Sequence, residues 1–281
     1  MPQTDTFRFS ISFPTADTES VEGLVWLESP AGIEENESAG QTRYTIYFTD
    51  QESAEAARES LLESGYAGSE IEKIVPQDWN AKWRETMEPA KLADGVWVSP
   101  EWLPPPMAEG DAWIRIEPKM AFGTGHHETT RLAAQAILSN ARKHGGALLD
   151  VGTGSGVLCF AAKLAGYASA LGVEIDSDCE ENLAENLALN TDYSEGVEFL
   201  IGGIDLAQGR KFDCIVMNMI RTESDPCIEP ASHLLTDGGL IVRSGILVEE
   251  KDSVIAWMKD RGFACSCESS EGEWWGGVFG R

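Results

Sequence analysis

A glycine-rich turn constrains the fold of this chain more than any other feature of its sequence. It lies in the run Leu-Leu-Asp-Val-Gly-Thr-Gly-Ser-Gly at residues 148–156, between apolar residues and a helix-forming segment. Glycines at a strand-to-helix turn let a ligand approach the backbone, because no Cβ stands in the way. The free N–H groups of the following helix then face any bound carboxylate or phosphate. The run therefore predicts a β-α unit with a ligand at the carboxyl end of its strand.

An acidic residue about 20 positions further on indicates the kind of ligand. Glu174 ends the next apolar run, where a carboxylate can accept hydrogen bonds from ribose hydroxyls. Val157, however, occupies the position of the third glycine in the dinucleotide fingerprint. This departure favours S-adenosylmethionine (SAM), which has a ribose and a carboxylate but no pyrophosphate. A tight structural turn that binds nothing is the alternative.

The second half of the chain alternates between helical and extended patterns. This order predicts a mostly parallel, doubly wound sheet with ligands at the carboxyl ends of its strands. A hairpin of residues 263–267 and 274–280 adds antiparallel strands at the end, and turns are expected at 237–239 and 244–247. Expected helices cover residues 157–164, 176–189, 227–235 and 253–261, and expected strands cover 113–116, 168–174, 197–201, 212–217 and 240–243.

Residues 1–75 have the pattern of a small separate domain. Phenylalanine and isoleucine alternate with polar residues over 7–13, as in a strand with one buried face. The order β-α-β-β-α-β that follows is that of a ferredoxin-like sandwich. We expect a connecting helix at 76–90, in which Trp79 and Trp83 share one face and pack between domains, and a catalytic domain at 91–281.

Charge and composition exclude several classes of protein. Acidic residues number 47 against 21 basic ones, and this net charge of −26 opposes RNA or DNA binding. Two explanations of this acidity are an acidic surface that keeps the protein soluble at high salt and a surface that attracts a lysine-rich protein partner; we favour the first. No apolar stretch of about 18 residues or signal peptide is evident. The six cysteines lack metal-ligand spacing, so we expect reduced thiols and a cytoplasmic protein.

Two further segments carry polar groups toward the same strand ends. Residues 120–130, Met-Ala-Phe-Gly-Thr-Gly-His-His-Glu-Thr-Thr, form a glycine-rich loop that enters a helix. The adjacent histidines point to different sides, and no acid or cysteine joins them at ligand spacing, so no metal site is expected. Asn218 follows the apolar run 214–217, and its amide oxygen can accept an N–H from a substrate amine. Its alternative role is that of a turn or cap residue.

These motifs together resemble the PrmA family, the SAM-dependent methyltransferases of ribosomal protein eleven of the large subunit. The resemblance rests on residues 120–131, 150–156, 172–176, 238–239, 244–247 and 271–274, on Asn218, and on the tryptophans of 78–102. It implies a class I methyltransferase fold, Rossmann-like, with a closing antiparallel hairpin. This chain departs from the family pattern at Glu174, which replaces an aspartate, and at Lys119, Arg221 and Arg243.

The resemblance also implies an activity and a set of site residues. The activity is N-methylation of lysine side chains and of the N-terminal α-amine, with the N-terminal domain holding the protein substrate. Asn218 is the candidate catalytic residue, and a monomer is expected. Another methyl acceptor, or SAM binding without catalysis, remains an alternative, whereas the Asn-Pro-Pro-Tyr motif of glutamine-directed enzymes is absent. The candidate SAM-binding residues are Phe122, Gly123, Thr124, Thr129, Thr130, Asp150, Gly152, Gly154, Gly156, Glu174, Ile175 and Asn218.

Overall fold

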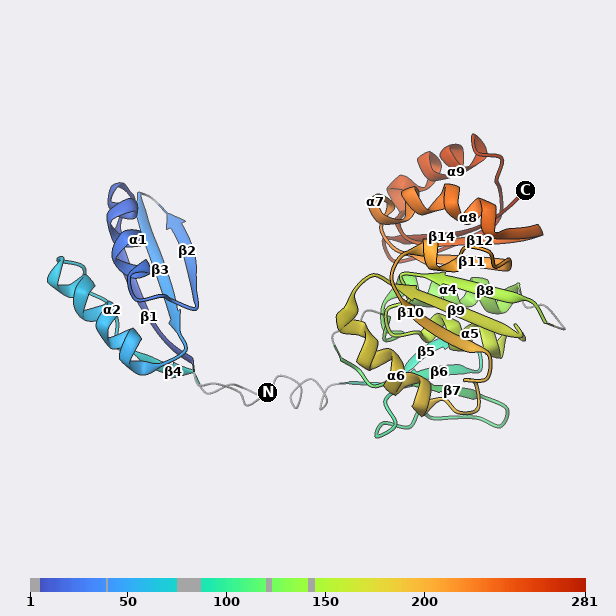
Figure 1. Cartoon of the computed structure of the whole chain (residues 1–281), viewed down its shortest axis with the longest axis horizontal. Helices are drawn as coiled ribbons and strands as arrows, with labels where there is room; N and C mark the ends of the chain where they lie inside the picture. The colour runs from blue at the N-terminus through green and yellow to red at the C-terminus, as the bar shows by residue number, and fades with distance from the viewer. Residues whose placement is uncertain (1–5, 39, 75–86, 120–122, 141–144) are drawn as a thin grey trace. The chain divides into compact units, whose positions relative to one another are not determined.

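The chain divides into two compact units, Met1–Met87 and Glu88–Arg281. The computed structural model describes residues 6–38, 40–74, 87–119, 123–140 and 145–281 (Figure 1). The predicted connecting helix with Trp79 and Trp83 lies outside these residues. Strand β5 begins at Ala90, inside the range predicted for that helix.

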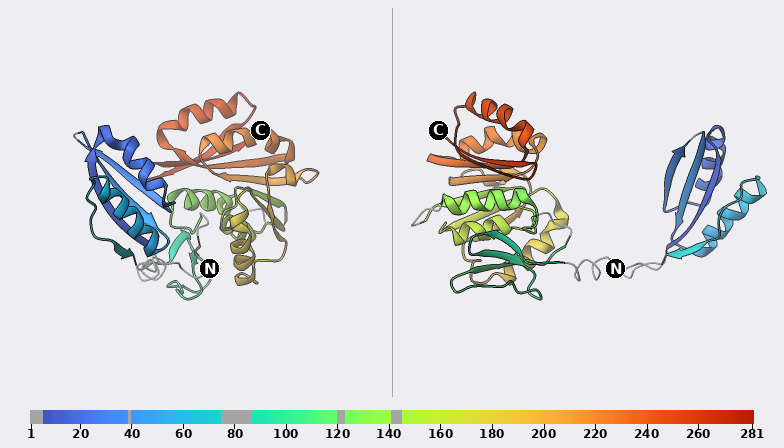
Figure 2. Two further views of the ribbon diagram at one scale, coloured as in Figure 1. Left: turned by 60° about the vertical axis from the view of Figure 1, so that its left-hand side comes forward. Right: turned by 180° about the vertical axis from the view of Figure 1, so that it is seen from behind.

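The first unit is the ferredoxin-like sandwich that the sequence predicts. Its four antiparallel strands have the order β2-β3-β1-β4. Both helices cover one face of this sheet (Figures 1 and 2). In chain order the elements are β1 (Thr6–Pro14), α1 (Thr18–Trp26), β2 (Gly32–Ser38), β3 (Gln41–Phe48), α2 (Gln51–Glu63) and β4 (Glu72–Ile74).

The side-chain pattern explains this arrangement. Phe9, Ile11 and Phe13 are buried because alternate residues of a strand face the same side of the sheet. Helix α2 begins where the side chain of Asp50 accepts a hydrogen bond from the Ser53 amide at 2.8 Å. The resulting core is almost entirely apolar.

The second unit is built on a seven-stranded sheet of order β10-β9-β8-β11-β12-β14-β13. The strands from β10 to β12 are parallel, and the terminal hairpin adds β14 and β13 antiparallel, as predicted. The strands are β8 (Ala147–Val151), β9 (Ser169–Glu174), β10 (Val197–Ile201), β11 (Phe212–Asn218), β12 (Leu235–Leu247), β13 (Ala264–Glu271) and β14 (Trp274–Gly280).

Helices cover both faces of this sheet, which makes it doubly wound (Figure 1). On one face α4 and α5 share a core with a small sheet of order β5-β6-β7, and on the other face α8 and α9 enclose a second core. The helices are α4 (Glu128–Ser139), α5 (Val157–Leu164), α6 (Glu180–Leu189), α7 (Arg221–Ser224), α8 (Ile228–Leu234) and α9 (Lys251–Lys259). The small sheet consists of β5 (Ala90–Ala93), β6 (Val96–Ser99) and β7 (Ala112–Arg115).

The predictions of turns at 237–239 and 244–247 were wrong, since both segments belong to the single strand β12. The register with the neighbouring strands shifts at both places, at Phe212/Cys214 opposite the first segment and at Arg243/Ile246 around the second. Gly238 and Gly245 have φ of 73° and 80°. Glycine tolerates this left-handed conformation, so the strand bulges there without ending.

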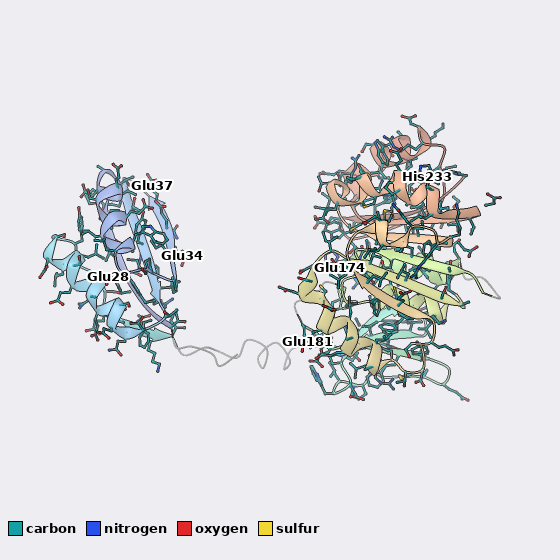
Figure 3. The ribbon with its side chains drawn as sticks, viewed as in Figure 1. Glu28, Glu34, Glu37, Glu174, Glu181 and His233 are labelled. Atoms are coloured by element: carbon teal, nitrogen blue, oxygen red, sulfur yellow. The ribbon has the colours of Figure 1, made fainter. Side chains whose placement is uncertain are left out.

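Acidic side chains occur on both units. Glu28, Glu34 and Glu37 extend from the first unit, and Glu174 and Glu181 from the second (Figure 3). All six cysteines are free thiols. No helix in the described parts of the chain is long and apolar enough to cross a membrane.

Candidate functional site

A cavity of about 780 Å³ opens at the carboxyl ends of β8, β9, β10 and β11. This is the edge of a parallel sheet where doubly wound proteins bind ligands. The candidate residues that line the cavity are Thr129, Gly152, Gly154, Glu174, Ile175 and Asn218. They come from three strand ends and from the start of α4, so the fold brings together residues that are far apart in the sequence.

The glycine turn fits its place only because Gly152 and Gly156 have no Cβ. Gly152 has a φ of 73°, and a Cβ there would lie 2.6 Å from the sulfur of Met219. Gly156 has a φ of 80°, and a Cβ there would lie 2.5 Å from the ring of Phe199. Both distances are shorter than van der Waals contact allows. The backbone of the turn therefore forms one wall of the cavity directly.

Glu174 is held in a fixed orientation at the tip of β9. Its two carboxylate oxygens accept hydrogen bonds from the backbone amides of Gly154, at 2.9 Å, and Asp176, at 3.1 Å. A carboxylate has about four acceptor sites, so lone pairs remain for hydroxyl donors in the cavity. Beside it the side chain of Ile175 is 81% exposed, which offers an apolar surface to a ligand. A ribose and its base match this pair of surfaces.

Other candidate residues stand behind the cavity wall. Asp150 is fully buried and accepts a hydrogen bond from the Thr153 hydroxyl at 2.6 Å. The pKa of the Asp150 carboxyl is raised to about 7, mainly by burial; the hydrogen bond from Thr153 opposes this shift, and the nearby Glu174 charge adds to it. Gly123 accepts a hydrogen bond from the Ser155 hydroxyl at 2.9 Å. Gly123, Thr124, Thr130, Asp150 and Gly156 are not among the residues that line the cavity, and Phe122 lies outside the described residues.

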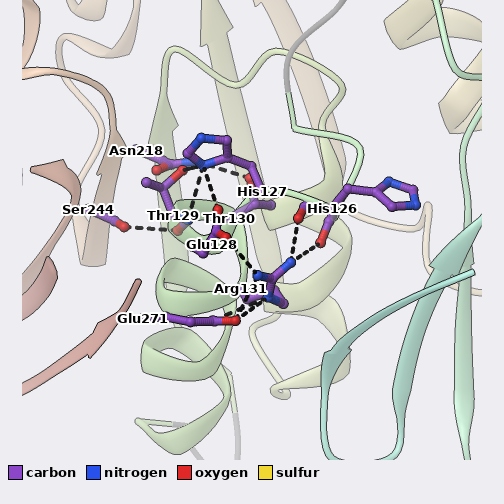
Figure 4. Close-up of polar contacts among 10 residues, drawn as sticks. His126, His127, Glu128, Thr129, Thr130, Arg131, Asn218, Ser244 and Glu271 are labelled. Atoms are coloured by element: carbon purple, nitrogen blue, oxygen red, sulfur yellow. Dashed lines mark hydrogen bonds and ion pairs between the residues drawn. The ribbon is translucent and has the colours of Figure 1, made fainter. Parts of the chain in front are cut away.

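Asn218 presents an unsatisfied acceptor. Its side-chain nitrogen lies 3.4 Å from the hydroxyl oxygen of Thr130, which is a long hydrogen bond (Figure 4). Its Oδ1 atom is buried and has no hydrogen-bond partner among the described residues. A buried polar atom without a partner costs free energy, and a ligand that donates an N–H recovers it. The side chain is therefore suited to an amine.

The two adjacent histidines of the loop diverge, as the sequence predicts. His127 caps α4, where its Nδ1 accepts a hydrogen bond from the Thr129 amide at 3.3 Å, and its ring lies 5.1 Å from that of Trp274. His126 points away and contacts the backbone oxygen of Glu88 at 2.7 Å (Figure 4). The described part of the chain contains no group of three His, Cys, Asp or Glu residues arranged to hold a metal ion.

The start of α4 is tied to the end of the chain. Arg131 donates from its Nε and Nη2 atoms to Glu271 at 3.0 and 2.7 Å, and from Nη1 to the backbone oxygen of His126 (Figure 4). Ser244 donates from its hydroxyl to the backbone oxygen of Thr129 at 2.8 Å. These charge-assisted and buried bonds fix the loop that carries His127 and Thr129 against β12 and β13.

The two arginines that depart from the family pattern do not line the cavity. Arg243 is fully buried, and its Nη2 donates to Asp225 at 2.5 Å and to the Ser224 hydroxyl at 2.7 Å. Arg221 donates to Asp225 at 3.3 Å and to the Ser253 hydroxyl at 2.9 Å. Burial lowers the pKa of Arg243, and the Asp225 charge opposes that shift. Both guanidiniums are thus engaged in holding α7.

Several wall residues were missing from the site prediction. The segment after β10 contributes Gly202, Gly203 and Ile204, and Met219 and Trp274 complete the wall. Position could have identified the first three, because every parallel strand of such a sheet ends at the same edge. Trp274 comes from the antiparallel hairpin, whose position at the cavity no local pattern in the sequence indicates.

Comparisons with known proteins agree with this geometry. The family model described as ribosomal protein L11 methyltransferase (PrmA) matches residues 10–279. The curated ribosomal protein L11 methyltransferase of Clostridium botulinum strain Eklund 17B is 34% identical over 230 residues, which are 82% of this chain and 72% of that protein. The curated protein of the same description from Geobacter sulfurreducens is 33% identical over 251 residues, which are 86% of this chain and 82% of that protein.

A solved structure supports the same relationship. The crystal structure of ribosomal protein L11 methylase from Lactobacillus delbrueckii subsp. bulgaricus superimposes with a TM-score of 0.63 at 26% identity. The superposition covers 69% of this chain and 99% of that one.

Proposed function

This chain belongs to the ribosomal protein L11 methyltransferase (PrmA) family, and we propose that it transfers methyl groups from SAM to amines of ribosomal protein L11. The amines are lysine side chains and the N-terminal α-amine of the substrate. The reaction takes place in the cytoplasm, where ribosomal proteins are assembled. The observation that carries the proposal is the buried, unpartnered Oδ1 atom of Asn218 at the wall of the cavity.

The residues that line the cavity suit SAM by their chemistry. When bound, SAM supplies a methyl group already activated by its sulfonium, so the protein needs no group to activate it. The carboxylate of Glu174, which the Gly154 and Asp176 amides orient, would accept hydrogen bonds from the ribose hydroxyls. The bare backbone of Gly152 and Gly154 allows the nucleoside to approach closely, and Ile175 covers its base. Thr129, at the first turn of α4, lies on the same wall.

The acceptor amine is oriented by Asn218. Methyl transfer requires a neutral amine whose lone pair faces the methyl group, and alignment of the two supplies most of the rate acceleration. The Oδ1 atom of Asn218 accepts one N–H of that amine and thereby directs the lone pair. Met219, Ile220 and Trp274 form apolar parts of the same wall and keep water away from the reacting atoms.

The charge of the cavity suits a protein amine. The ionisable residues that line it are Glu174, Asp176, Glu223, His127 and two cysteines, and no lysine or arginine is among the lining residues. A lysine side chain arrives as a cation and is attracted by such a wall. The resemblance to the family assigns the task of holding the protein substrate to the first unit, and the residues that line this cavity all belong to the second.

A labelling experiment tests the proposal. The protein is incubated with isotopically labelled SAM and the purified ribosomal proteins of the same organism, and the mass of each protein is measured. We expect L11 to gain mass in steps of one methyl group, and the label to be located at lysines and the N-terminus. A labelled protein other than L11 redirects the proposal to that acceptor. SAM binding without any labelled ribosomal protein contradicts it.

The same assay run with a variant tests the role of Asn218. Asn218→Ala removes the acceptor and leaves the residues assigned to SAM in place. Methyl transfer at saturating SAM then falls although SAM still binds. Wild-type turnover by this variant would refute the assignment.

A further inference from the structure

Two asparagines of α6 and the asparagine that caps its C-terminus lie one helical turn apart and are all buried. Asn182, Asn186 and Asn190 have at most 2% of their surface exposed. Residues four apart share one face of a helix, so their amides form a row. A buried amide is tolerated only when its donors and acceptors find partners. The partners of this row show what it does.

The row binds the backbone of the last residue of β7, Arg115, and of Glu117, which follows the strand. Asn190 accepts a hydrogen bond from the Arg115 amide at 2.9 Å and donates to the Arg115 oxygen at 2.6 Å. Asn186 accepts from the Glu117 amide at 2.7 Å, and Asn182 donates to the Glu117 oxygen at 2.8 Å. Both backbone groups of alternate residues are thus satisfied by side chains. The row of amides replaces a neighbouring strand along this edge of the small sheet.

The opposite edge of the same segment is also paired. The Ile116 amide donates to the Ser99 oxygen at 3.1 Å, at the end of β6. The side chain of Lys119 forms an ion pair with Glu185 of α6 at 2.7 Å. Residues 115–119 therefore lie between β6 and α6, with bonds to both. Their position follows that of α6.

Asn186 also has a bond that leads to the glycine turn. Its Nδ2 donates to the backbone oxygen of Ser155 at 2.9 Å. Ser155 lies between Gly154 and Gly156, and its hydroxyl donates to the Gly123 oxygen at 2.9 Å. Neither Asn182 nor Asn190 has a hydrogen bond to the turn among the described residues. Asn186 is therefore the member of the row that joins the small sheet to the cavity wall.

The small sheet also supports the side of the cavity formed by the start of α4. A Cβ on Gly125 would lie 3.2 Å from Val98 and 3.4 Å from Ala90, so the loop before α4 rests on β5 and β6. His126 contacts the backbone oxygen of Glu88 at 2.7 Å, just before β5. The glycine turn and the start of α4 are thus both positioned against one sheet, although they belong to different elements.

We propose that Asn186 is a positioning residue for the methyl donor. It fixes the position of the glycine turn relative to the small sheet. Because the start of α4 rests on the same sheet, Asn186 also fixes the distance between the turn and the start of α4. Without it the turn remains but is no longer held at the separation that SAM requires. The inference rests on the proposed SAM site, and it assigns Asn186 no contact with SAM or with the reacting atoms.

A matched pair of variants tests the proposal. Asn186→Ala and Asn190→Ala each delete a buried amide of the row that has three hydrogen bonds, but only the first frees the Ser155 oxygen. We expect both variants to have a lower Tm than the wild type. Calorimetric titration with SAM should give a Kd raised about tenfold or more for Asn186→Ala and less than threefold for Asn190→Ala. Equal weakening in the two variants, or an unchanged Kd in Asn186→Ala, overturns the proposal.

Hydrogen exchange in the unaltered enzyme gives a second test that needs no variant. SAM should slow the exchange of the Arg115 and Glu117 amides, which donate to Asn190 and Asn186 and do not line the cavity. Amides of β1 in the first unit serve as the reference. If SAM slows the Gly154 amide and leaves Arg115 and Glu117 unchanged, the coupling is absent. Failure of L11 methylation with these results intact contradicts only the proposed acceptor.

Discussion

The two units of this protein treat buried polar groups differently. Within the described residues of the first unit, Thr42 is the one polar residue that is buried. The second unit buries many, among them Asp150, Arg243 and the row of Asn182, Asn186 and Asn190. Burying a polar group contributes little to stability even when it is satisfied, and it is costly when a partner is missing. In the second unit, several of these buried polar groups lie close to the cavity.

The difference indicates that the core residues of the first unit serve stability, whereas the buried polar residues near the cavity of the second unit serve function. In the first unit a change of shape in the core should alter stability alone. Around the cavity of the second unit, a change that removes one atom should alter binding or catalysis. The following predictions test this contrast, beginning with the largest expected change in free energy.

Replacing Phe13 should destabilise the first unit strongly. Its ring is buried and packs edge-on against Tyr44 with the ring centroids 5.0 Å apart. Phe13→Ala should lower the free energy of unfolding by about 4 kcal/mol, because a buried phenylalanine leaves a cavity. Denaturant titration measures this change. The Kd for SAM, measured by calorimetry, should stay within about twofold of the wild-type value, because the core that contains Phe13 belongs to a separate unit that contributes no residue to the cavity lining. A SAM affinity that falls with the stability would remove the contrast.

Replacing Asn218 should reduce turnover with little effect on stability. Asn218→Ala should lower kcat by about 100-fold, the usual loss when a positioned polar group at the reacting atoms is removed. Methyl transfer to L11 at saturating SAM measures the effect. Thr222→Ala, on the exposed surface of α7, is the matched control and should retain full activity. Comparable losses in the two variants would show that the region is merely sensitive to change.

Replacing Glu174 should weaken the binding of SAM and leave the rate of methyl transfer at saturating SAM largely unchanged. Glu174→Gln removes the negative charge and one acceptor that bind the Gly154 and Asp176 amides. A charge-assisted hydrogen bond is roughly twice as strong as a neutral one, so we expect the Kd for SAM to rise about tenfold. Glu180→Gln, on the exposed first turn of α6, is the control. An unchanged Kd in Glu174→Gln would mean that the ribose lies elsewhere.

The smallest effect concerns the pH dependence of stability. The pKa of Asp150 is raised by burial from 3.8 to about 7, so the native state holds this proton at pH values where the unfolded state has lost it. Stability from this group is therefore present at low pH and declines until the pH passes about 7. Between pH 6 and pH 8 the decline is about 1.4 kcal/mol.

Asp150→Asn should remove that decline. Comparing the free energy of unfolding of the variant and the wild type across this pH range isolates the contribution of Asp150 from those of the many surface carboxylates. Parallel curves for the two proteins would show that Asp150 is ionised throughout.

Regular elements and strand ends could be predicted from the sequence because their causes are local. The helix predicted over 157–164 and the strand predicted over 197–201 are α5 and β10 with the same bounds. Both are continuous apolar or alternating runs between turn-forming residues. The acid Glu174 and the amide Asn218 could be placed at the cavity because each directly follows an apolar run.

What could not be predicted depends on contacts between distant segments. Gly245 looks like a turn residue, yet β12 continues through it because Trp275 of β14 pairs with Ile246. Asn186 looks like an ordinary polar residue of a surface helix, and only the position of β7 gives it buried partners. Arg243 likewise acquires its role from Asp225 on another element. Such pairings follow from the assembled fold and not from local propensity.

The order in which the cavity wall is made has a consequence for biosynthesis. Trp274 in β14 completes a wall that starts at His127, and β14 lies between β12 and β13 in the sheet. The ribosome adds Trp274 almost 150 residues after His127. A nascent chain therefore lacks a complete methyl-transfer pocket until its closing hairpin has been translated. Any product of premature termination or proteolysis without β14 is missing part of this wall, even when its glycine turn is intact.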